Sequence, residues 1–159
     1  IIAIGDSANI AAHLGIPVSS GLTEIVSGVE RRMPNDKFFV PGSVLSMDVD
    51  PTHPLAYGFD ASVDVMWENS PALKVGPDGL LKGVTPVGWI GSDKPLRSGW
   101  AWGQQYLKGL ATALDVSYGK GKVFIFTPEI TFRAQPHATF KFLFNGIYYG
   151  SAKAVTLGK

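Results

Sequence analysis

The 159-residue chain contains no cysteine. Without thiols it cannot form a disulfide, bind a metal through thiolates or attack a substrate with a cysteine nucleophile, because each of these chemistries requires sulfur. Long apolar runs are missing as well, since none approaches the roughly 18 to 20 residues that a bilayer-crossing helix needs. We therefore expect no membrane span.

Charged residues are scarce, at 17% of the chain, and the 14 Lys and Arg nearly balance the 13 Asp and Glu. The basic residues are scattered and form no stripe, so the electrostatic footprint of a nucleic-acid-binding protein is missing. Hydrophobic residues make up 45% of the chain, which is typical of one compact domain. We assign residues 1–150 to that domain and residues 151–159 to a loosely docked C-terminal tail.

The chain begins inside an apolar segment. Ile1 to Gly5 predicts a short strand, and Asp6 and Ser7 then provide side chains that cap a helix over about residues 8–14. An independent protein usually begins with a solvated lead-in. We therefore expect this chain to be part of a longer one.

The middle of the chain carries weaker signals. Residues 17–41 show helical spacing of apolar side chains, and a surface helix and a loop are the alternatives there. Alternation of apolar and polar residues predicts strands over residues 44–49 and 63–67, and residues 84–90 are expected to form another strand. Dense turn chemistry over residues 50–54 reverses the chain between the first two of these strands.

A hairpin is the clearest local pattern. Two β-rich runs, residues 110–118 and 123–126, are joined by Gly119-Lys120-Gly121-Lys122, whose glycines supply the positive φ of a hairpin turn. The second run is apolar on both faces. It therefore predicts a strand inside the sheet, with helices covering it above and below.

A final helix is predicted over about residues 136–149, with Pro136 near its first turn and Gly150 just past its end. The spacing assigns its core-facing stripe to Phe140, Leu143, Phe144 and Ile147. Its flanks also carry apolar side chains, namely Phe142, Tyr148 and Tyr149. We therefore expect more than this domain to cover the helix.

The segment Gly5-Asp6-Ser7-Ala8-Asn9 invites comparison with the nucleophile elbow of α/β hydrolases. The second glycine of that motif is replaced by Asn9, and helix capping explains Asp6 and Ser7 without catalysis. Capping is the favoured interpretation. A Ser7 nucleophile with His137 as base, oriented by Glu129 or Asp115, is the weaker alternative.

The three histidines, His13, His53 and His137, are isolated from one another. No His-x-x-Glu or His-Glu-x-x-His pair places two metal ligands on one face of an element. We expect no metal site in this chain.

The polar loop between the inner strand and the last helix contains Glu129, Arg133, Gln135 and His137. Ligands of open α/β sheets bind at the carboxyl ends of strands, so this loop is a candidate binding crevice. The alternative is structural, with Glu129 and Arg133 forming an ion pair and Gln135 capping the helix.

A second candidate is the stretch around Ser98-Gly99-Trp100-Ala101-Trp102-Gly103. Two tryptophans between glycines form an aromatic platform for a sugar ring or a protein surface, or else at least one of them packs in the core. Arg97 precedes them and is included among the ligand-binding or interface candidates.

Four segments resemble the C-terminal domain of bacterial proteins in the zinc carboxypeptidase (carboxypeptidase A-like) family. These segments are Phe38–Val44 (Phe-Phe-Val-Pro-Gly-Ser-Val), Asn69–Pro71, Lys94–Gly103 and Phe132–Gly150. The similarity runs over nearly the whole chain.

The resemblance implies an α/β fold like that of class I glutamine amidotransferases. That fold is a flavodoxin-like three-layer sandwich with a mixed, mostly parallel sheet, and here it would lack its first N-terminal βα units. The resemblance also implies an upstream zinc peptidase domain that hydrolyses peptides, in a secreted or periplasmic parent protein. No zinc ligand of the family has a matching position in this chain, and without cysteine amidotransferase catalysis is excluded.

The leading hypothesis is therefore a non-catalytic accessory domain whose partner is the upstream peptidase domain and which needs no cofactor itself. The alternative is a module that binds a glycan or a cell-wall peptide through Trp100, Trp102 and Arg133.

Overall fold

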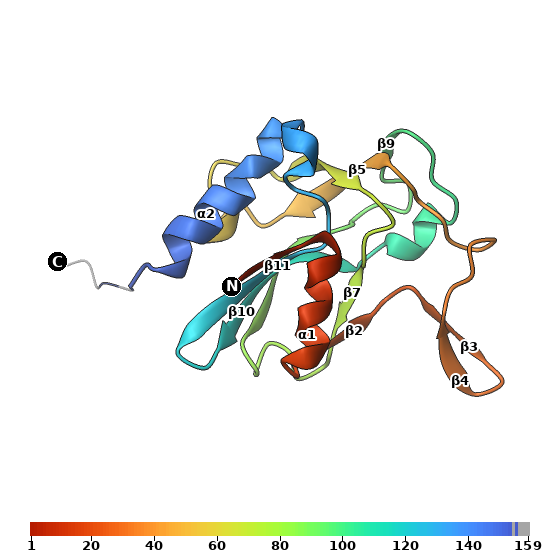
Figure 1. Cartoon of the computed structure of the whole chain (residues 1–159), viewed down its shortest axis with the longest axis horizontal. Coiled ribbons are helices and arrows are strands. Elements are labelled where there is room, and N and C mark those ends of the chain that lie inside the picture. Colours follow the sequence, from red (N-terminus) through yellow and green to blue (C-terminus); the bar gives the residue numbers. More distant parts are fainter. Residues whose placement is uncertain (154, 156–159) are drawn as a thin grey trace.

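The computed structural model describes residues 1–153 and residue 155 (Figure 1). Its α-helices are α1 (Ile10–His13) and α2 (Phe140–Gly150). Its strands are β1 (Ile2–Ile4), β2 (Val18–Ser20), β3 (Thr23–Val26), β4 (Val29–Arg32), β5 (Ser43–Val49), β6 (Ser62–Trp67), β7 (Leu73–Val75), β8 (Val84–Trp89), β9 (Leu96–Ser98), β10 (Ala111–Tyr118) and β11 (Gly121–Phe126).

Within these described residues, neither helix has the length and apolar character needed to cross a bilayer. This confirms that part of the expectation from sequence. The expected loose docking of the tail concerns residues 151–159, and five of these positions, 154 and 156–159, lie outside the described residues.

Nine strands form one sheet, whose main path runs β1-β11-β10-β8-β5-β6. β7 pairs with β10 and β2, β9 pairs with β5, and β3 and β4 form a separate hairpin. Among the described strand pairs, β1 with β11 is the one parallel pair, in the register Ile2 to Phe124 and Ile4 to Phe126.

The expectation of a flavodoxin-like, amidotransferase-like sandwich with a mostly parallel sheet is therefore wrong. Strands account for 36% of residues and helices for 21%, and the sheet is largely antiparallel. Parallel neighbours need a crossover connection, usually a helix. From β5 to β11, the described strands follow one another through turns and short 3₁₀ segments, so they pair antiparallel.

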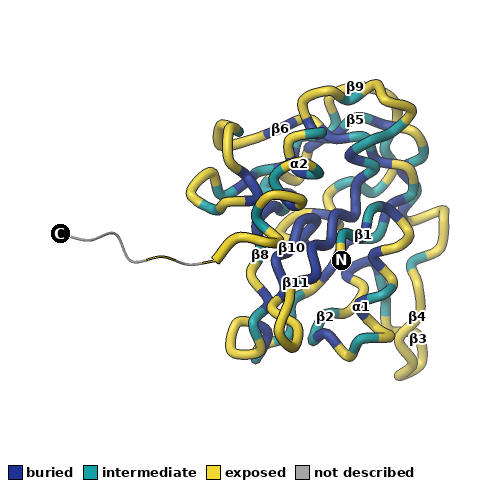
Figure 2. The backbone as a smooth tube through the Cα atoms, turned by 60° about the vertical axis from the view of Figure 1, so that its left-hand side comes forward, coloured by how far each residue is buried: buried dark blue, intermediate teal, exposed yellow. Residues whose placement is uncertain are grey.

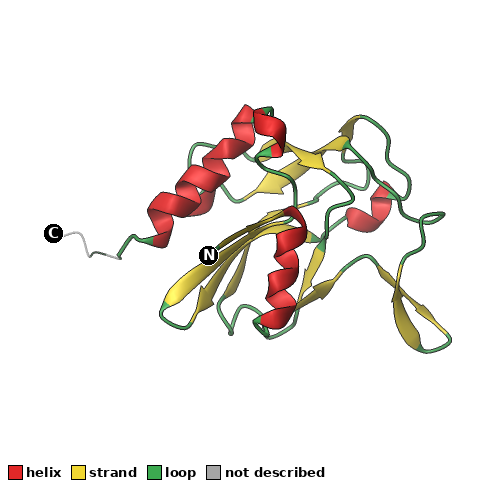
Figure 3. Ribbon diagram, in the orientation of Figure 1, coloured by secondary structure: helices red, strands yellow, loops and turns green. Residues whose placement is uncertain are grey.

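β11 is buried on both faces, as its apolar run predicts. Phe124 and Phe126 belong to the core on the side of α2, where Phe126 contacts Phe142 with ring centroids 5.1 Å apart. Val123 and Ile125 belong to a second core that contains residues of the α1 segment. Figure 3 shows the two helices against this part of the sheet, and Figure 2 shows the buried strands between them.

The helix α2 forms, but the stripe predicted to face the core is wrong. Phe142 and Gly146 are buried, whereas Phe144 and Ile147 are exposed. Glycine decides the orientation, because a Cβ on Gly146 would lie 3.1 Å from Ile2 Cδ1 and 3.2 Å from Phe124 Cδ2. The helix therefore turns its glycine side to the sheet, and large apolar side chains face outward.

Residues 17–41 differ from both alternatives, since they contain β2 and the β3–β4 hairpin in place of a helix or plain loop. The turn between β3 and β4 consists of Ser27 and Gly28, both with positive φ (52° and 79°). Two consecutive positive φ values match the twist of a two-residue hairpin, which overrides the helical spacing.

A buried polar cluster fastens the end of α2 to the sheet. Asp115 on β10 accepts hydrogen bonds from Lys122 Nζ at 2.9 and 3.1 Å and lies 3.3 Å from His53 Nε2. His53 Nδ1 accepts the N–H of Leu55 at 3.2 Å, so both ring nitrogens are engaged. The ring of Tyr149, from α2, meets the His53 ring edge-on and lies under Lys122.

The charges of this cluster stabilise one another. Burial alone would raise the pKa of Asp115, but hydrogen bonds from His53 and Lys122 outweigh it and bring the pKa below its usual 3.8. Because the folded-state pKa is the lower one, this contribution to stability is present above about pH 4 and is lost as the pH falls through the folded-state pKa.

We predict that Asp115→Asn lowers the free energy of unfolding by about 2 kcal/mol at pH 7, since Lys122 loses its charged partner. Urea titrations at pH 7 and pH 3 measure the effect, and the gap between wild type and variant narrows at pH 3. Asp78→Asn serves as control, because Asp78 pairs with Lys82 in solvent and its loss has little effect. Equal effects of the two variants would contradict the assignment.

Candidate functional site

The carboxyl ends of β1 and β11 meet because these two strands are parallel. The turn that begins at Gly5 follows β1, and the loop with Glu129 follows β11. The Glu129 carboxylate lies directly against Gly5, since a Cβ at that position would be 1.9 Å from Glu129 Oε1. Gly5 also has a φ of +59°. Glycine therefore suits this position for two reasons, because it adopts a positive φ without strain and has no side chain to collide with Glu129.

Three carboxylates act on one another at this edge. Burial raises the pKa of Glu129, and the negative charges of Asp6 and Glu68 raise it further. The main-chain N–H of Glu129 donates to the Met66 carbonyl at 2.9 Å, which ties the loop to β6. Within the described residues no Lys, Arg or His nitrogen lies within 4.0 Å of the Glu129 carboxylate.

The Ser7 hydroxyl is already engaged in hydrogen bonds with the backbone. Its Oγ accepts the N–H of Ile4 and donates to the Ile4 carbonyl, each at 2.6 Å. The predicted capping is thus found only in part, because Ser7 bonds back to the residue before the 3₁₀ turn Gly5–Asn9, whereas α1 begins at Ile10 without a side-chain cap. In the described part of the chain, no hydrogen bond joins Ser7 to His137, Glu129 or Asp115, the residues named for a hydrolase triad. Asp115 lies with His53 and Lys122, and the His137 ring packs 5.5 Å from that of Phe140.

The polar loop does not form the ion pair considered as its structural alternative. Glu129 faces Gly5, whereas the Arg133 guanidinium lies 5.0 Å from the centroid of the Phe132 ring. Arg133 has a φ of +47°, an uncommon conformation for a side-chain-bearing residue. Arg133, Gln135 and His137 are all exposed.

Arg97 and Gln135 both lie near Asp64. The Nε of Arg97 donates to Asp64 Oδ1 at 3.3 Å, and both side chains of this ion pair are more than half exposed to solvent. Asp64 and Gln135 line a cavity of ≈310 Å³ together with Phe132 and Pro136. An exposed pair of this kind contributes little to stability.

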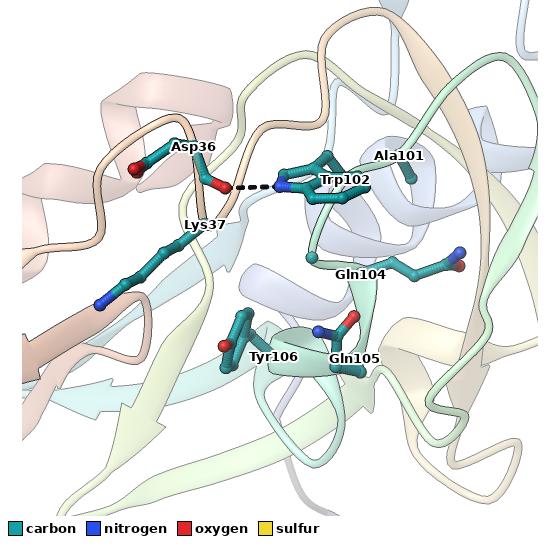
Figure 4. A pocket seen from close by; sticks show the side chains of 8 residues that line it. Asp36, Lys37, Ala101, Trp102, Gln104, Gln105 and Tyr106 are labelled. Atoms are coloured by element: carbon teal, nitrogen blue, oxygen red, sulfur yellow. Dashed lines mark hydrogen bonds between the residues drawn. The ribbon is translucent and has the colours of Figure 1, made fainter.

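Both tryptophans of the aromatic stretch are exposed, Trp100 at 54% and Trp102 at 53%. Trp100 packs edge-on against Phe39, with ring centroids 6.0 Å apart. Trp102 instead lines an open cavity of ≈390 Å³, shown in Figure 4. The other side chains around this cavity belong to Asp36, Lys37, Ala101, Gln104, Gln105 and Tyr106.

Four of the seven sequence candidates are divided among three places, and Trp100, Arg133 and His137 lie at none of them. Trp102 lines the aromatic cavity, Arg97 and Gln135 surround Asp64, and Glu129 lies at the edge where β1 and β11 end. Tyr106 was missed, although it follows Trp102 closely. Asp36 was missed too, and no local pattern points to it, because pairing of Phe39 with Trp102 brings it there.

Across residues 1–153 and 155, no three His, Asp or Glu side chains are grouped so that they could hold a metal ion. No protein-family model and no curated protein matches this chain.

We predict that Glu129→Gln raises the free energy of unfolding at pH 7 by less than about 1 kcal/mol, the gain being limited by solvent screening. The folded-state pKa of Glu129 is raised, so the wild type loses stability as the pH rises through it. Urea unfolding at pH 7 and pH 3 tests this, with the two proteins converging at pH 3. A variant less stable than wild type at pH 7 would refute the repulsion.

Proposed function

We propose that this chain is a non-catalytic accessory domain of a zinc metallocarboxypeptidase and that it packs against the peptidase domain through the outer face of α2. The proposal starts from the resemblance of four segments of this chain to the C-terminal domain of that family. One structural observation supports it, an apolar strip on α2 that residues 1–153 and 155 leave uncovered.

The strip consists of Phe144, Ile147 and Tyr148. These positions lie one helical turn apart, so their side chains share one face of α2. Ile147 is 55% exposed and Tyr148 is 76% exposed, which is unusual for side chains of this size. A cluster of exposed apolar side chains indicates a protein contact more often than a single exposed apolar residue does.

The strip continues onto the sheet. Ile147 lines a groove of ≈610 Å³ with Ile1, Tyr118 and Gly146, between the helix and the edge where β1 lies. β1 is the last strand on its side of the sheet. A partner that packs on the strip therefore reaches an open strand edge as well, and covering such an edge protects its unpaired backbone groups.

The charges around the strip indicate the character of the partner surface. Lys122 lines the same groove but is paired with Asp115, whereas Lys141 lies one helical turn before Phe144, and the helix itself carries no acidic residue. A matching surface is apolar in the centre with carboxylates at its rim, since complementary rim charges orient the encounter.

The proposal predicts what the DNA upstream of the Ile1 codon encodes. It should encode a His-x-x-Glu motif followed far downstream by a lone His, which is the zinc-ligand pattern of a metallocarboxypeptidase. The pure 159-residue chain should hydrolyse no peptide from its carboxyl end. An upstream frame without such a peptidase, or turnover by the pure chain, would refute the proposal.

We predict that this chain and the separately produced peptidase domain elute together in gel filtration and that Ile147→Asp abolishes their association. A charge at the centre of an apolar contact cannot be solvated there, so affinity falls at least about tenfold. Calorimetric titration gives the affinity of each pair.

Ile25→Asp is the matched control, because Ile25 is 77% exposed on the β3–β4 hairpin, away from α2 (Figure 1). Circular dichroism checks that both variants keep the fold. Association that survives Ile147→Asp, or that Ile25→Asp weakens equally, would show that α2 is not the contact.

A further inference from the structure

The cavity beside Trp102 is lined by two aromatic rings with free faces. The Trp102 side chain is 53% exposed and that of Tyr106 is 42% exposed, and both line the same hollow of ≈390 Å³ (Figure 4). This volume lies near the lower end of the roughly 300–1,000 Å³ range of ligand sites. It suits one or two small rings better than a folded segment.

The Trp102 ring is held in place by one distant segment of the chain, residues 36–39. Its Nε1–H donates to the Asp36 carbonyl at 2.6 Å, and its backbone pairs with Phe39 in both directions at 2.9 and 3.0 Å. Gly103 follows with a φ of +73°, and a Cβ there would lie 2.0 Å from the Lys37 carbonyl oxygen. The platform is therefore preorganised, which lowers the entropic cost of binding.

Tyr106 is fixed by its own turn. The 3₁₀ turn Gln104–Leu107 places Leu107 fully in the core, which leaves Gln105 and Tyr106 at the surface. Gln104 Oε1 accepts the Leu96 N–H at 3.1 Å, and its amide nitrogen remains as a donor. The cavity thus combines aromatic faces with amide donors and acceptors.

The charges of the cavity disfavour a phosphate or another anion. Lys37 is paired with Glu24 of β3, and its hydrogen bond with Glu24 raises the pKa of Lys37. The carboxylate of Asp36 is exposed at the rim and adds a negative charge. Among the described residues that line the cavity, no cation is left without an anionic partner, so the charges favour a neutral ligand over an anionic one.

The lining also disfavours an apolar peptide side chain. Apart from the two rings, the sole apolar side chain that lines the cavity is the small Ala101, whereas pockets for apolar groups are lined mainly by larger hydrophobic residues. A pyranose ring fits better, because its C–H face packs on an aromatic ring while its hydroxyls pair with amides and carboxylates.

We propose that this cavity is a saccharide-binding site, with Trp102 as the stacking platform, Tyr106 as the second wall, and Gln104, Gln105 and Asp36 as hydrogen-bonding partners of a neutral sugar. The site is separate from the α2 strip. Sugar binding can therefore be tested independently of the association with a peptidase domain.

The test uses the purified chain and four neutral probes, chitotriose, cellotriose, maltotriose and mannotriose, titrated by calorimetry and by tryptophan fluorescence. We expect saturable binding of at least one trisaccharide, with a change in emission. Trp102→Ala should weaken that binding at least about tenfold and remove the emission change, and Tyr106→Ala should weaken it several-fold.

Trp100→Ala is the matched control, since Trp100 is equally exposed but lies against Phe39 outside the cavity lining. Trp102→Phe provides a second variant that keeps an aromatic face and retains part of the affinity. Thermal unfolding confirms that each variant folds.

Three outcomes would overturn the site. They are the absence of saturable binding with all four sugars, binding that Trp100→Ala weakens as much as Trp102→Ala does, and Trp102-dependent binding of a sugar-free cell-wall stem peptide in place of the sugars. Loss of affinity confined to Trp102→Ala and Tyr106→Ala supports it.

Discussion

The close approach of α2 to the sheet at Gly146 is the constraint on which the rest of the structure depends. With hydrogen in place of a side chain, the helix backbone comes within van der Waals reach of Ile2 and Phe124, on the parallel pair β1 and β11. Phe142 then stacks over Phe59 and contacts Phe126, and Tyr149 lies over Phe124. A larger residue at 146 would displace the helix and open this core, where packing is dense enough for one methyl group to matter.

Orienting α2 through its glycine has a second consequence, because the helix is apolar around most of its circumference. Once Phe142 and Gly146 face the sheet, Phe144, Ile147 and Tyr148 have no place inside the domain. The cluster of Asp115, His53, Lys122 and Tyr149 reinforces this orientation at the last turn of the helix. The exposed strip is thus the result of a well-packed interior and not of a loosely attached helix, which is what a domain surface shaped for a partner requires.

The helices and strands that the local sequence pattern predicts correctly are those that pack against segments close to them in the sequence. The β10–β11 hairpin follows from its glycines and from the two-sided apolar run of β11, and alternation alone predicts β5 and β6. The face of α2 does not follow, because nearly every position is apolar and a contact with Ile2, 144 residues earlier, decides it. The β3–β4 hairpin was missed for another reason, since Ser27 and Gly28 adopt positive φ in a segment whose apolar residues happen to have helical spacing. Antiparallel pairing overturned the expected parallel sandwich because crossover helices are missing between the described strands from β5 onward.

The same distinction between local and long-range determinants applies to the candidate binding sites. Trp102 is visible in the sequence as an aromatic residue beside glycine, but its value as a platform comes from Asp36 and Phe39, which long-range pairing brings against it. The 3₁₀ turn that carries Tyr106 and the helix α2 lie in different parts of the molecule (Figures 1 and 3). The two proposals therefore use separate surfaces, and a partner on α2 would leave the aromatic cavity open to solvent. If both proposals hold, the domain would bind an enzyme on one side and a sugar on the other, which would raise the local concentration of a glycan-linked substrate near the enzyme.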